Sequence, residues 1–568
     1  MYEFDIENGE LRKYKGTDVC ISVPDGVTRI GDSAFSGKET LTEIIFPKGL
    51  KEIGSSAFFD CKSLTEVVIP NGVRKISDYA FSGCTALANA VIPDSGRELG
   101  ESAFSYCASR GAVNLPKKLK QISDGCFEGC EALTEIEVPE GVTSLKAGAF
   151  ENCSALTTVS LPETLTHIGY SAFNECIALV NINVPEGVTV IDSGAFEECS
   201  SLLSLTLPKN LDCVHCAVFS GCTALTSIVI PEGVTVIENY AFSGCESLTE
   251  LVIPSTVKSI GREAFSSCAS LKSIHIPKNV KKIYDRQFVG CKALTEITVD
   301  EDNQYFKSVD GVLYTKNGEI LLAYPAGKAV DRFSIPNGVL TVAEYAFGNA
   351  DHLTEVTVPG SMKNVKQFAF CGCESLIRME LPEGVKEIGY SAFSYCCNLK
   401  WVSLPDSVKH VSTETFSECP SLEDIRLSSK RVTVGERAFW GIPSTGRIYA
   451  GFGILEHIEG KFDENAWVCA IRGFLTRYYA RETGWKETEK WREYVNKRTR
   501  KAFRLMPNEP LLYRFLTENN TISPNRVDKL LANTDNPECR AILLEYQNSH
   551  RKNNKSINDS IDDKFTIN

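Results

Sequence analysis

Cysteine is the residue type in this sequence whose number and spacing most suggest chemistry. The chain of 568 residues holds 22 cysteines, and thiolates serve as metal ligands, nucleophiles and redox groups. Most of these cysteines recur every 23 residues, which indicates a stacked repeat. Equivalent side chains of neighbouring repeats would point in parallel, which is poor geometry for a disulfide even though their α-carbons would lie only about 5 Å apart. We therefore predict that the cysteines recurring at 23-residue intervals are buried free thiols with a packing role. They are Cys61, Cys84, Cys107, Cys130, Cys153, Cys176, Cys199, Cys222, Cys245, Cys268, Cys291, Cys373, Cys396 and Cys419.

One cysteine pair stands outside this spacing and resembles a metal or redox motif. Cys213 and Cys216 form a C-x-x-C with His215 between them. Structural zinc needs four converging ligands, and Cys222 is the only further nearby candidate. Val214 also occupies an ordinary core position of its repeat. We expect no metal site and no cofactor.

Known catalytic motifs are missing from the sequence. It contains no G-x-S-x-G, no phosphate-binding G-x-x-x-x-G-K-S/T and no H-E-x-x-H. The seven histidines fall mostly in different repeats, so the repeat register assembles no cluster of a histidine, a carboxylate and a nucleophile. We expect a protein without catalytic residues.

The elements that must position these residues come from a 23-residue repeat. In one unit Leu64, Val67 and Ile69 have the L-x-x-L-x-L spacing of a short strand with one buried face, and Pro70 ends that strand. An Ala-Phe pair then starts a short helical or 3₁₀ turn on the opposite side. Each unit is apolar on one side only, so stacked units are needed to build a core. The repeat phenylalanines are Phe35, Phe58, Phe81, Phe104, Phe127, Phe150, Phe173, Phe196, Phe219, Phe242, Phe265, Phe288, Phe347, Phe370, Phe393, Phe416 and Phe439.

This unit, a strand of L-x-x-L-x-L-P form followed by Ile-Gly-x-x-Ala-Phe-x-x-Cys, resembles the 23-residue leucine-rich repeat of BspA-like bacterial proteins. The resemblance covers roughly residues 20–445. It implies an α/β repeat solenoid, a right-handed rod of 17 coils whose parallel sheet lines the concave side. At about 5 Å per coil the rod would be on the order of 80 Å long.

Four segments depart from the repeat. Residues 1–20 carry an Asn8-Gly9 turn between apolar alternations, which predicts a β-hairpin that caps the solenoid of residues 21–445. About residues 300–335 form an insertion with two turn signals, which predicts a β-hairpin excursion from the rod. Residues 446–548 change to helical spacing and predict a module of four or five helices, and residues 549–568 have the composition of a disordered tail.

Charge divides at the same boundary. Residues 1–460 hold 40 basic and 58 acidic side chains, whereas residues 461–568 hold 20 basic and 15 acidic ones. The basic excess lies in the helix around Lys497–Arg504. A solvated helix face explains such a run, and contact with nucleic acid, an acidic membrane surface or a protein remains the alternative. The overall charge of −13 otherwise argues against nucleic-acid binding.

The x positions of each strand project outward and can be read from the register. They form a mostly acidic strip with interspersed valine that becomes mixed and aromatic late in the chain, which suits a protein partner with basic groups. Trp401 lies among basic residues there and is a plausible anchor. The candidate partner-binding residues are Glu66, Val68, Glu135, Glu137, Val229, Glu250, Val252, His275, Arg378, Trp401 and Arg426.

These observations predict a non-enzymatic scaffold that binds a protein partner on the concave face. A cell-surface adhesin that binds host or matrix proteins is one alternative. A recognition rod that tethers a basic helical effector or nucleic-acid-binding module is another. The sequence has no signal-peptide pattern and no apolar run long enough to span a membrane, so we expect a cytoplasmic protein, with the cell surface or secretion as the alternative.

Overall fold

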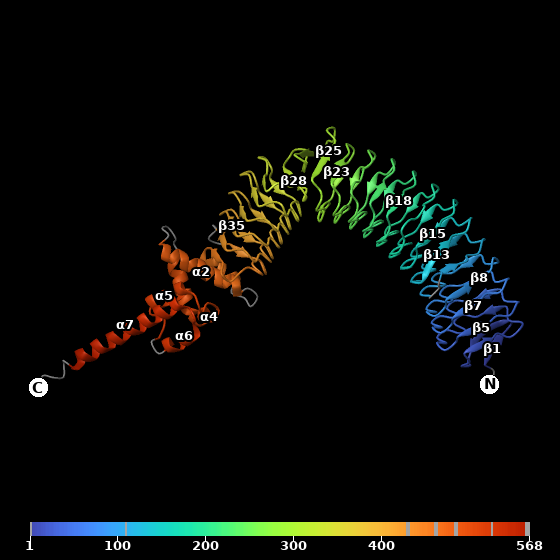
Figure 1. Ribbon diagram of the computed structural model, residues 1–568, viewed down its shortest axis with the longest axis horizontal. Helices are drawn as coiled ribbons and strands as arrows, with labels where there is room; N and C mark the ends of the chain where they lie inside the picture. Colours follow the sequence, from blue (N-terminus) through green and yellow to red (C-terminus); the bar gives the residue numbers. More distant parts are fainter. Residues whose placement is uncertain are drawn as a thin grey trace. The chain divides into compact units, whose positions relative to one another are not determined.

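The structure is a computed structural model that describes residues 3–107, 111–427, 432–458, 464–481, 487–523 and 526–562. The chain divides into two compact units. The first consists of Met1–Gly318 and Leu322–Lys328, and the second of Glu319–Leu321 and Ala329–Asn568. Figure 1 shows repeat coils in both units and helices at the carboxyl end of the second.

The fold is a parallel-strand β-solenoid of about 19 turns, which confirms the predicted repeat architecture. Most coils contribute two short strands, which pair in parallel with the equivalent strands of neighbouring coils. In one coil β7 (Glu66–Val68) carries the L-x-x-L-x-L pattern, and β8 (Lys75–Ile76) follows the turn after Pro70. Their partners in neighbouring coils lie 23 residues away in the sequence, so the repeat length sets the register.

The longer strands of the first unit carry the outward side chains predicted above, and they pair as four separate parallel sheets. They are β3 (Cys20–Ser22), β5 (Glu43–Ile45), β7, β9 (Asn89–Val91), β11 (Gly111–Val113), β13 (Leu133–Glu137), β15 (Thr158–Ser160), β18 (Ser204–Thr206), β20 (Ser227–Val229), β23 (Ser273–Ile276) and β25 (Glu296–Val299). The two-residue strands are β4 (Arg29–Ile30), β6 (Glu52–Ile53), β8, β10 (Glu98–Leu99), β12 (Gln121–Ile122), β14 (Ser144–Leu145), β16 (His167–Ile168), β17 (Val190–Ile191), β19 (Cys213–Val214), β21 (Val236–Ile237), β22 (Ser259–Ile260) and β24 (Lys282–Ile283).

The second unit repeats this arrangement. Its longer strands are β29 (Arg332–Ser334), β31 (Glu355–Thr357), β33 (Arg378–Glu380), β35 (Trp401–Leu404), β37 (Asp424–Leu427) and β39 (Arg447–Tyr449). Its two-residue strands are β30 (Thr341–Val342), β32 (Asn364–Val365) and β34 (Glu387–Ile388), and β36 (His410–Val411) pairs with β38 (Thr433–Val434). Residues of β28 (Ile320–Ala323) belong in part to each unit.

The core of each unit contains a stack of phenylalanine rings. From Phe35 to Phe288 successive rings are nearly parallel, with centroids 4.9–6.1 Å apart. A second stack runs from Phe347 to Phe439 at 4.7–6.0 Å. One buried ring per coil thus ties each repeat to its two neighbours, as a solenoid requires.

The fourteen repeat cysteines are buried free thiols, as predicted. Each thiol donates a hydrogen bond to the main-chain carbonyl of the phenylalanine 26 residues earlier, at Sγ–O distances of 3.1–3.3 Å. Burial raises the pKa of the Cys130 and Cys291 thiols to about 12. These fourteen residues, the cysteine column, therefore satisfy buried carbonyl groups, and burial keeps their thiols protonated.

The Ala-Phe segment consists of successive turns instead of the helical or 3₁₀ turn expected from the sequence. The N–H groups of the segment alternate between two kinds of partner: Phe58 donates to the Ala80 carbonyl of the next coil at 2.7 Å, whereas Phe59 donates to the Ser56 carbonyl of its own segment at 3.1 Å. Ser56 and Asp60 adopt left-handed backbone conformations with φ of 54° and 56°. Two such residues per coil are incompatible with a helix.

The predicted amino-terminal hairpin is present. β1 (Phe4–Glu7) pairs antiparallel with β2 (Glu10–Tyr14) through Asn8 and Gly9, which have φ of 52° and 79°. β2 then pairs with β4, and the Tyr14 ring stacks on Phe35 at 5.5 Å. The hairpin thus covers the first phenylalanine of the core.

The insertion also contains a hairpin, formed by β26 (Phe306–Val309) and β27 (Val312–Thr315). It is not an excursion from the rod, because the Ile297 N–H of β25 donates to the Gly311 carbonyl at 2.8 Å and Ser308 donates to the Ile297 carbonyl. Leu313 and Tyr314 are buried. The apolar side chains from which the strands were predicted therefore pack onto the last coil of the first unit.

Helices follow β39 in the second unit and outnumber the four or five expected. They are η1 (Phe452–Ile454), α1 (Leu455–Ile458), α2 (Glu464–Ala480), α3 (Thr488–Lys497), α4 (Thr499–Leu505), α5 (Pro510–Glu518), α6 (Val527–Asn533) and α7 (Pro537–Asp562). α2 packs against β39, where Gly473 leaves room for the main chain of Ile448. α7 passes through residue 549, where the sequence predicted a disordered tail to begin, and residues 563–568 lie outside the described part of the chain.

Candidate interaction surfaces

We define the outward sheet face as the exposed side chains of the L-x-x-L-x-L segments. In the first unit all eight predicted residues of this face are exposed: Glu66, Val68, Glu135, Glu137, Val229, Glu250, Val252 and His275. Val229 and Val252 are 73% and 77% exposed although they are apolar. They occupy the same outward position in consecutive coils, and His275 follows in the next coil, where its Nδ1 lies 3.0 Å from the Thr298 hydroxyl. The register therefore builds a short apolar row flanked by carboxylates such as Glu250.

The outward sheet face of the second unit has a different character. Strand pairing places Glu355, Arg378 and Trp401 at one position of three successive strands. The Arg378 guanidinium lies 5.0 Å from the centre of the Trp401 ring and 3.4 Å from the Glu380 carboxylate. Arg378 is exposed and Trp401 is half-buried. A cation–π pair held by a carboxylate fixes the ring in a defined position.

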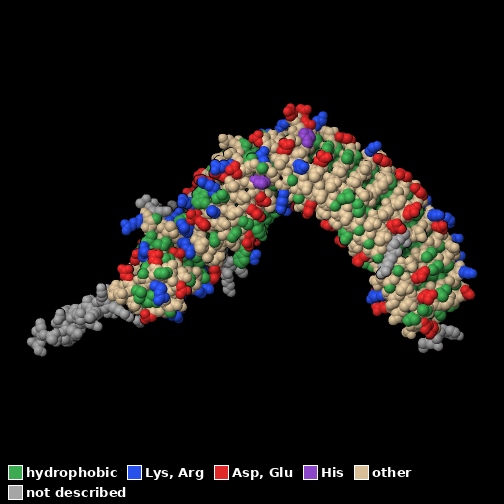
Figure 2. Space-filling model, in the orientation of Figure 1, with side chains coloured by type: hydrophobic (Ala, Val, Ile, Leu, Met, Phe, Trp, Pro, Cys, Tyr) green, Lys and Arg blue, Asp and Glu red, His purple; other side chains and the backbone are tan. Residues whose placement is uncertain are grey.

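The same sheet continues with a second pair of this kind. The exposed Arg426 lies 5.7 Å from the centre of the Tyr449 ring. Glu355, Arg378 and Glu380 also line a shallow hollow of about 250 Å³ beside Pro382. Over the face visible in Figure 2, acidic and basic side chains alternate along the coils and do not gather into one large patch of either charge. The outward sheet face of the second unit thus carries local clusters of charge and aromatic surface.

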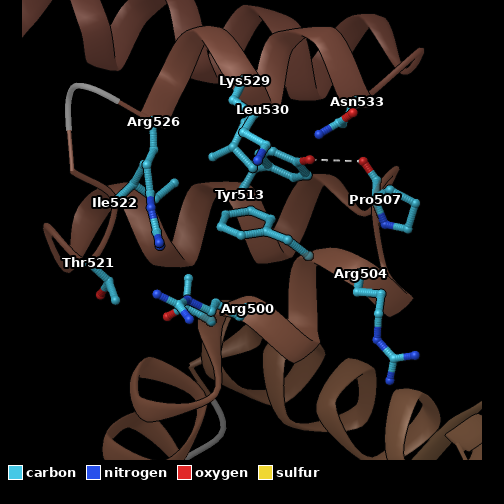
Figure 3. Close-up of a pocket in the computed structure, with 12 residues that line it drawn as sticks. Arg500, Arg504, Pro507, Tyr513, Thr521, Ile522, Arg526, Lys529, Leu530 and Asn533 are labelled. Atoms are coloured by element: carbon cyan, nitrogen blue, oxygen red, sulfur yellow. Dashed lines mark hydrogen bonds between the residues drawn. The ribbon is translucent and has the colours of Figure 1, made fainter.

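The helical region contains a cavity of about 540 Å³ formed between α4, α5 and α6 (Figure 3). Arg500, Arg526 and Lys529 line it, and within the described residues their side chains make no ion pair or hydrogen bond. In Figure 3 the Arg500 and Arg526 side chains point toward one another from opposite walls. Arg504 also lines the cavity, but the Glu464 carboxylate neutralises it at 2.6 Å. The cavity thus concentrates uncompensated positive charge.

Two polar residues of its walls are already hydrogen-bonded within the protein. The Tyr513 hydroxyl donates to the Pro507 carbonyl at 3.0 Å, and the Thr521 hydroxyl donates to the Asn496 side chain at 2.9 Å. Phe503 and Leu530 supply apolar surface. The cavity therefore combines cations with an apolar wall.

The predicted basic helix around Lys497–Arg504 does not present one continuous charged face. Lys497 pairs with Glu493 at 2.5 Å. Lys501 lies 4.6 Å from the centre of the Trp467 ring, and Arg498 lies 4.9 Å from that of Tyr494. Within Lys497–Arg504, Arg500 lines the cavity and has no partner among the described residues.

The C-x-x-C segment belongs to a third cluster of functional groups, in the first unit. The Cys213 Sγ, a ring nitrogen of His215 and a carboxylate oxygen of Glu238 all lie within 4.8 Å of one another, and all three residues are half-buried. The Cys216 N–H donates to the same carboxylate at 2.9 Å. Burial, followed by the Glu238 carboxylate, raises the pKa of Cys213 to about 12, which is the opposite of what a nucleophilic cysteine needs.

This cluster corrects two sequence-based expectations. The repeat register does bring a histidine, a carboxylate and a cysteine together, because Glu238 lies 23 residues after His215 and therefore in the next coil. Cys222 is not the further neighbour of the motif, since its thiol bonds to the Phe196 carbonyl in the core. The 23-residue spacing alone could therefore have predicted that Glu238 lies beside His215.

Among the described residues, no helix has the length and apolar character needed to cross a membrane. The family model described as the BspA type leucine rich repeat region matches residues 15–134, 120–222, 212–309 and 326–445. Comparison with curated proteins finds no match.

Several solved structures are similar to this chain. A leucine-rich repeat protein of Bacteroides ovatus is 24% identical, with 72% of this chain and 93% of that chain covered and a TM-score of 0.42. One of Eubacterium ventriosum is 24% identical, with coverage of 61% and 78% and a TM-score of 0.42. A leucine rich cell surface protein of Faecalibacterium prausnitzii is 24% identical, with coverage of 79% and 92% and a TM-score of 0.37.

Proposed function

The chain belongs to the BspA-type leucine-rich repeat family, and from this premise we propose that it is a non-enzymatic scaffold that binds a protein partner on its outward sheet face. Leucine-rich repeats generally serve protein–protein interaction. Solenoids do so because stacked coils display one extended surface whose side chains vary freely from coil to coil.

The observation that carries the proposal is the exposure of Val229 and Val252 in consecutive coils. Apolar side chains in water gain free energy when a partner covers them, at about 25 cal/mol per Å². Glu250 and Glu296 lie on the same face and are exposed. A partner segment that carries both apolar and basic groups therefore fits this part of the first unit best.

Trp401 supplies an anchor in the second unit. Its ring is held by Arg378 and is half-buried before any partner binds, so little side-chain entropy is lost on binding. Tryptophan and arginine are the residue types that contribute most often to binding hot spots. We propose that each unit contributes contacts, apolar and acidic in the first and aromatic and cationic in the second.

Affinity capture with the full chain tests the proposal when wild-type and altered baits are compared quantitatively. A partner that binds the outward sheet face is captured less by Val252→Asp and by Trp401→Ala. Capture that is equal for all baits would contradict the proposal.

A second binding function is favoured by the cavity of the helical region. Arg500 and Arg526 face one another there without an acidic partner among the described residues, and like charges repel unless an anion lies between them. We propose that the cavity binds the phosphate or carboxylate of a ligand whose apolar part rests against Phe503. Its volume of about 540 Å³ is that of a small-molecule site. Binding of phenyl phosphate by the full chain tests this proposal.

A further inference from the structure

The half-buried cluster of Cys213, His215 and Glu238 has a donor set that neither the repeat nor the proposed binding surfaces explain. The three side chains offer one thiol sulfur, one imidazole nitrogen and one carboxylate oxygen. This mixture of soft and borderline ligands is the one that zinc accepts, whereas magnesium and calcium prefer oxygen alone. We propose that Cys213, His215 and Glu238 bind one Zn²⁺ ion.

The geometry places the donors close enough for a single ion. The three ligand atoms lie within 4.8 Å of one another, and the His215 Nδ1 lies 3.5 Å from the Glu238 Oε2. Donors of a tetrahedral zinc ion, at bond lengths of about 2.0–2.3 Å, are separated by about 3.3–3.8 Å. Small side-chain rotations that move the ligand atoms about 1 Å closer together therefore complete the site, with no movement of the coils.

Two neighbouring coils fix the site on the backbone. Cys213 lies in β19, which pairs with β21 (Val236–Ile237), and Glu238 directly follows β21. The Cys216 N–H donates to the Glu238 Oε2 at 2.9 Å, which orients the carboxylate. Hydrogen bonds of this kind to a ligand hold it in position for a metal.

The repeat itself marks this place as unusual. At the position after the second strand, seven coils have glycine, among them Gly169 and Gly261, whereas the coils between these two have Asp192, His215 and Glu238. Glycine suits this position because a Cβ at Gly169 would lie 2.8 Å from the Leu145 carbonyl oxygen. Three successive coils thus carry a carboxylate or an imidazole at a position where seven coils have glycine.

Asp192 does not complete the ligand set. Its carboxylate lies 2.6 Å from the His167 Nε2, so it is already paired within the neighbouring coils. Three protein ligands with the fourth position open to water are typical of zinc sites that act on a substrate, whereas structural sites have four. The three ligands found here therefore leave one coordination position of the ion open to solvent.

Titration of the full chain with Co²⁺, which replaces Zn²⁺ and reports its ligands by absorption, tests the assignment. We expect one Co²⁺ per chain, a thiolate-to-cobalt charge-transfer band, and displacement by one equivalent of Zn²⁺. Cys213→Ser should abolish the band, and His215→Gln and Glu238→Gln should each weaken binding at least tenfold. Cys216→Ser is the matched control, since it removes a thiol three residues away and should keep the band.

Three results would overturn the proposal. They are the absence of saturable binding at one equivalent, a band that survives Cys213→Ser, or a band that Cys216→Ser abolishes. Circular dichroism of each variant checks that the solenoid is intact, as we expect because these three positions are only half-buried. Neither readout depends on a protein partner, so the result is independent of the proposed scaffold function.

Discussion

The Cys199 thiol donates a hydrogen bond to the main-chain carbonyl of Phe173, 26 residues earlier, at an Sγ–O distance of 3.1 Å. The same carbonyl accepts the Cys176 N–H at 3.2 Å, so the thiol satisfies the second lone pair of a buried oxygen. Cysteine is suited to this place because it is small, is buried readily and still has a weak donor. The cysteine column is therefore part of the hydrogen-bonding structure of the core.

Burial of this column predicts very unequal thiol reactivity. Cys199 is buried and its pKa is raised by burial, whereas Cys20 is exposed. Because the thiolate is the reactive form, iodoacetamide should label Cys20 rapidly and Cys199 only when its coil opens. Peptide mass spectrometry over a time course measures both rates in one sample. Similar rates at the two positions in the native protein would show that the column is accessible.

The raised thiol pKa values predict loss of stability in alkali. The pKa of Cys130 is about 12 in the folded chain and about 8.5 in an unfolded one, so between these values the unfolded chain has released a proton that the folded chain retains. The free energy of unfolding should fall there by about 1.4 kcal/mol per pH unit for each such thiol and stay constant below pH 8.5.

Urea denaturation between pH 8 and 11 measures this slope. Cys130→Ala, which copies the alanine found at Ala350 of another coil, should make the slope shallower by about one thiol's share. Cys20→Ala is the control and should leave the slope as it is. An unchanged slope in Cys130→Ala would contradict the role given to the buried thiol.

The phenylalanine stack predicts a large local cost for losing one ring. Phe196 is fully buried between Phe173 and Phe219, at centroid distances of 5.5 and 5.9 Å. Phe196→Ala should cost about 3–5 kcal/mol, seen as faster amide hydrogen exchange in the adjoining coils. Phe59→Ala removes an exposed ring and should change exchange by less than about 0.5 kcal/mol. Equal effects of the two substitutions would rule out the stack as the main packing element.

The cavity of the helical region predicts charge-dependent binding of phenyl phosphate. Arg500→Gln and Arg526→Gln should each weaken binding about tenfold or more, because each removes a charge-assisted hydrogen bond to the phosphate. Lys490→Gln, an exposed cation outside the cavity, should leave the affinity unchanged. Isothermal titration calorimetry with the full chain measures all four proteins. Binding that ignores both arginine substitutions would place the ligand elsewhere.

The repeat could be predicted in detail because the 23-residue spacing sets both the strand register and the columns of Phe and Cys. The exposure of the outward residues followed from the same spacing, since strand side chains alternate between two faces. The local conformation of the Ala-Phe segment did not follow. Its left-handed positions are occupied by residues such as Tyr79 and Tyr240, at φ of 57° and 59°, and these types give no turn signal.

Contacts between coils were harder to predict than the coils themselves. The insertion hairpin has the turn signal at Asp310-Gly311, but only the structure shows that Tyr314 is buried. The cation–π pair of Arg378 and Trp401 depends on side-chain rotamers that a spacing of 23 does not determine. The helical region has no repeat, so its cavity depends on how α4, α5 and α6 pack.

The binding role of the outward sheet face is tested most directly by quantitative affinity capture with four altered full-length baits. Val252→Asp and Trp401→Ala alter the face, while Val309→Asp and Trp440→Ala change an exposed valine and an exposed tryptophan elsewhere. We expect a common set of proteins whose capture falls at least tenfold with the first two baits and not with the controls. Capture that is equal for the wild type and all four baits would contradict the central claim.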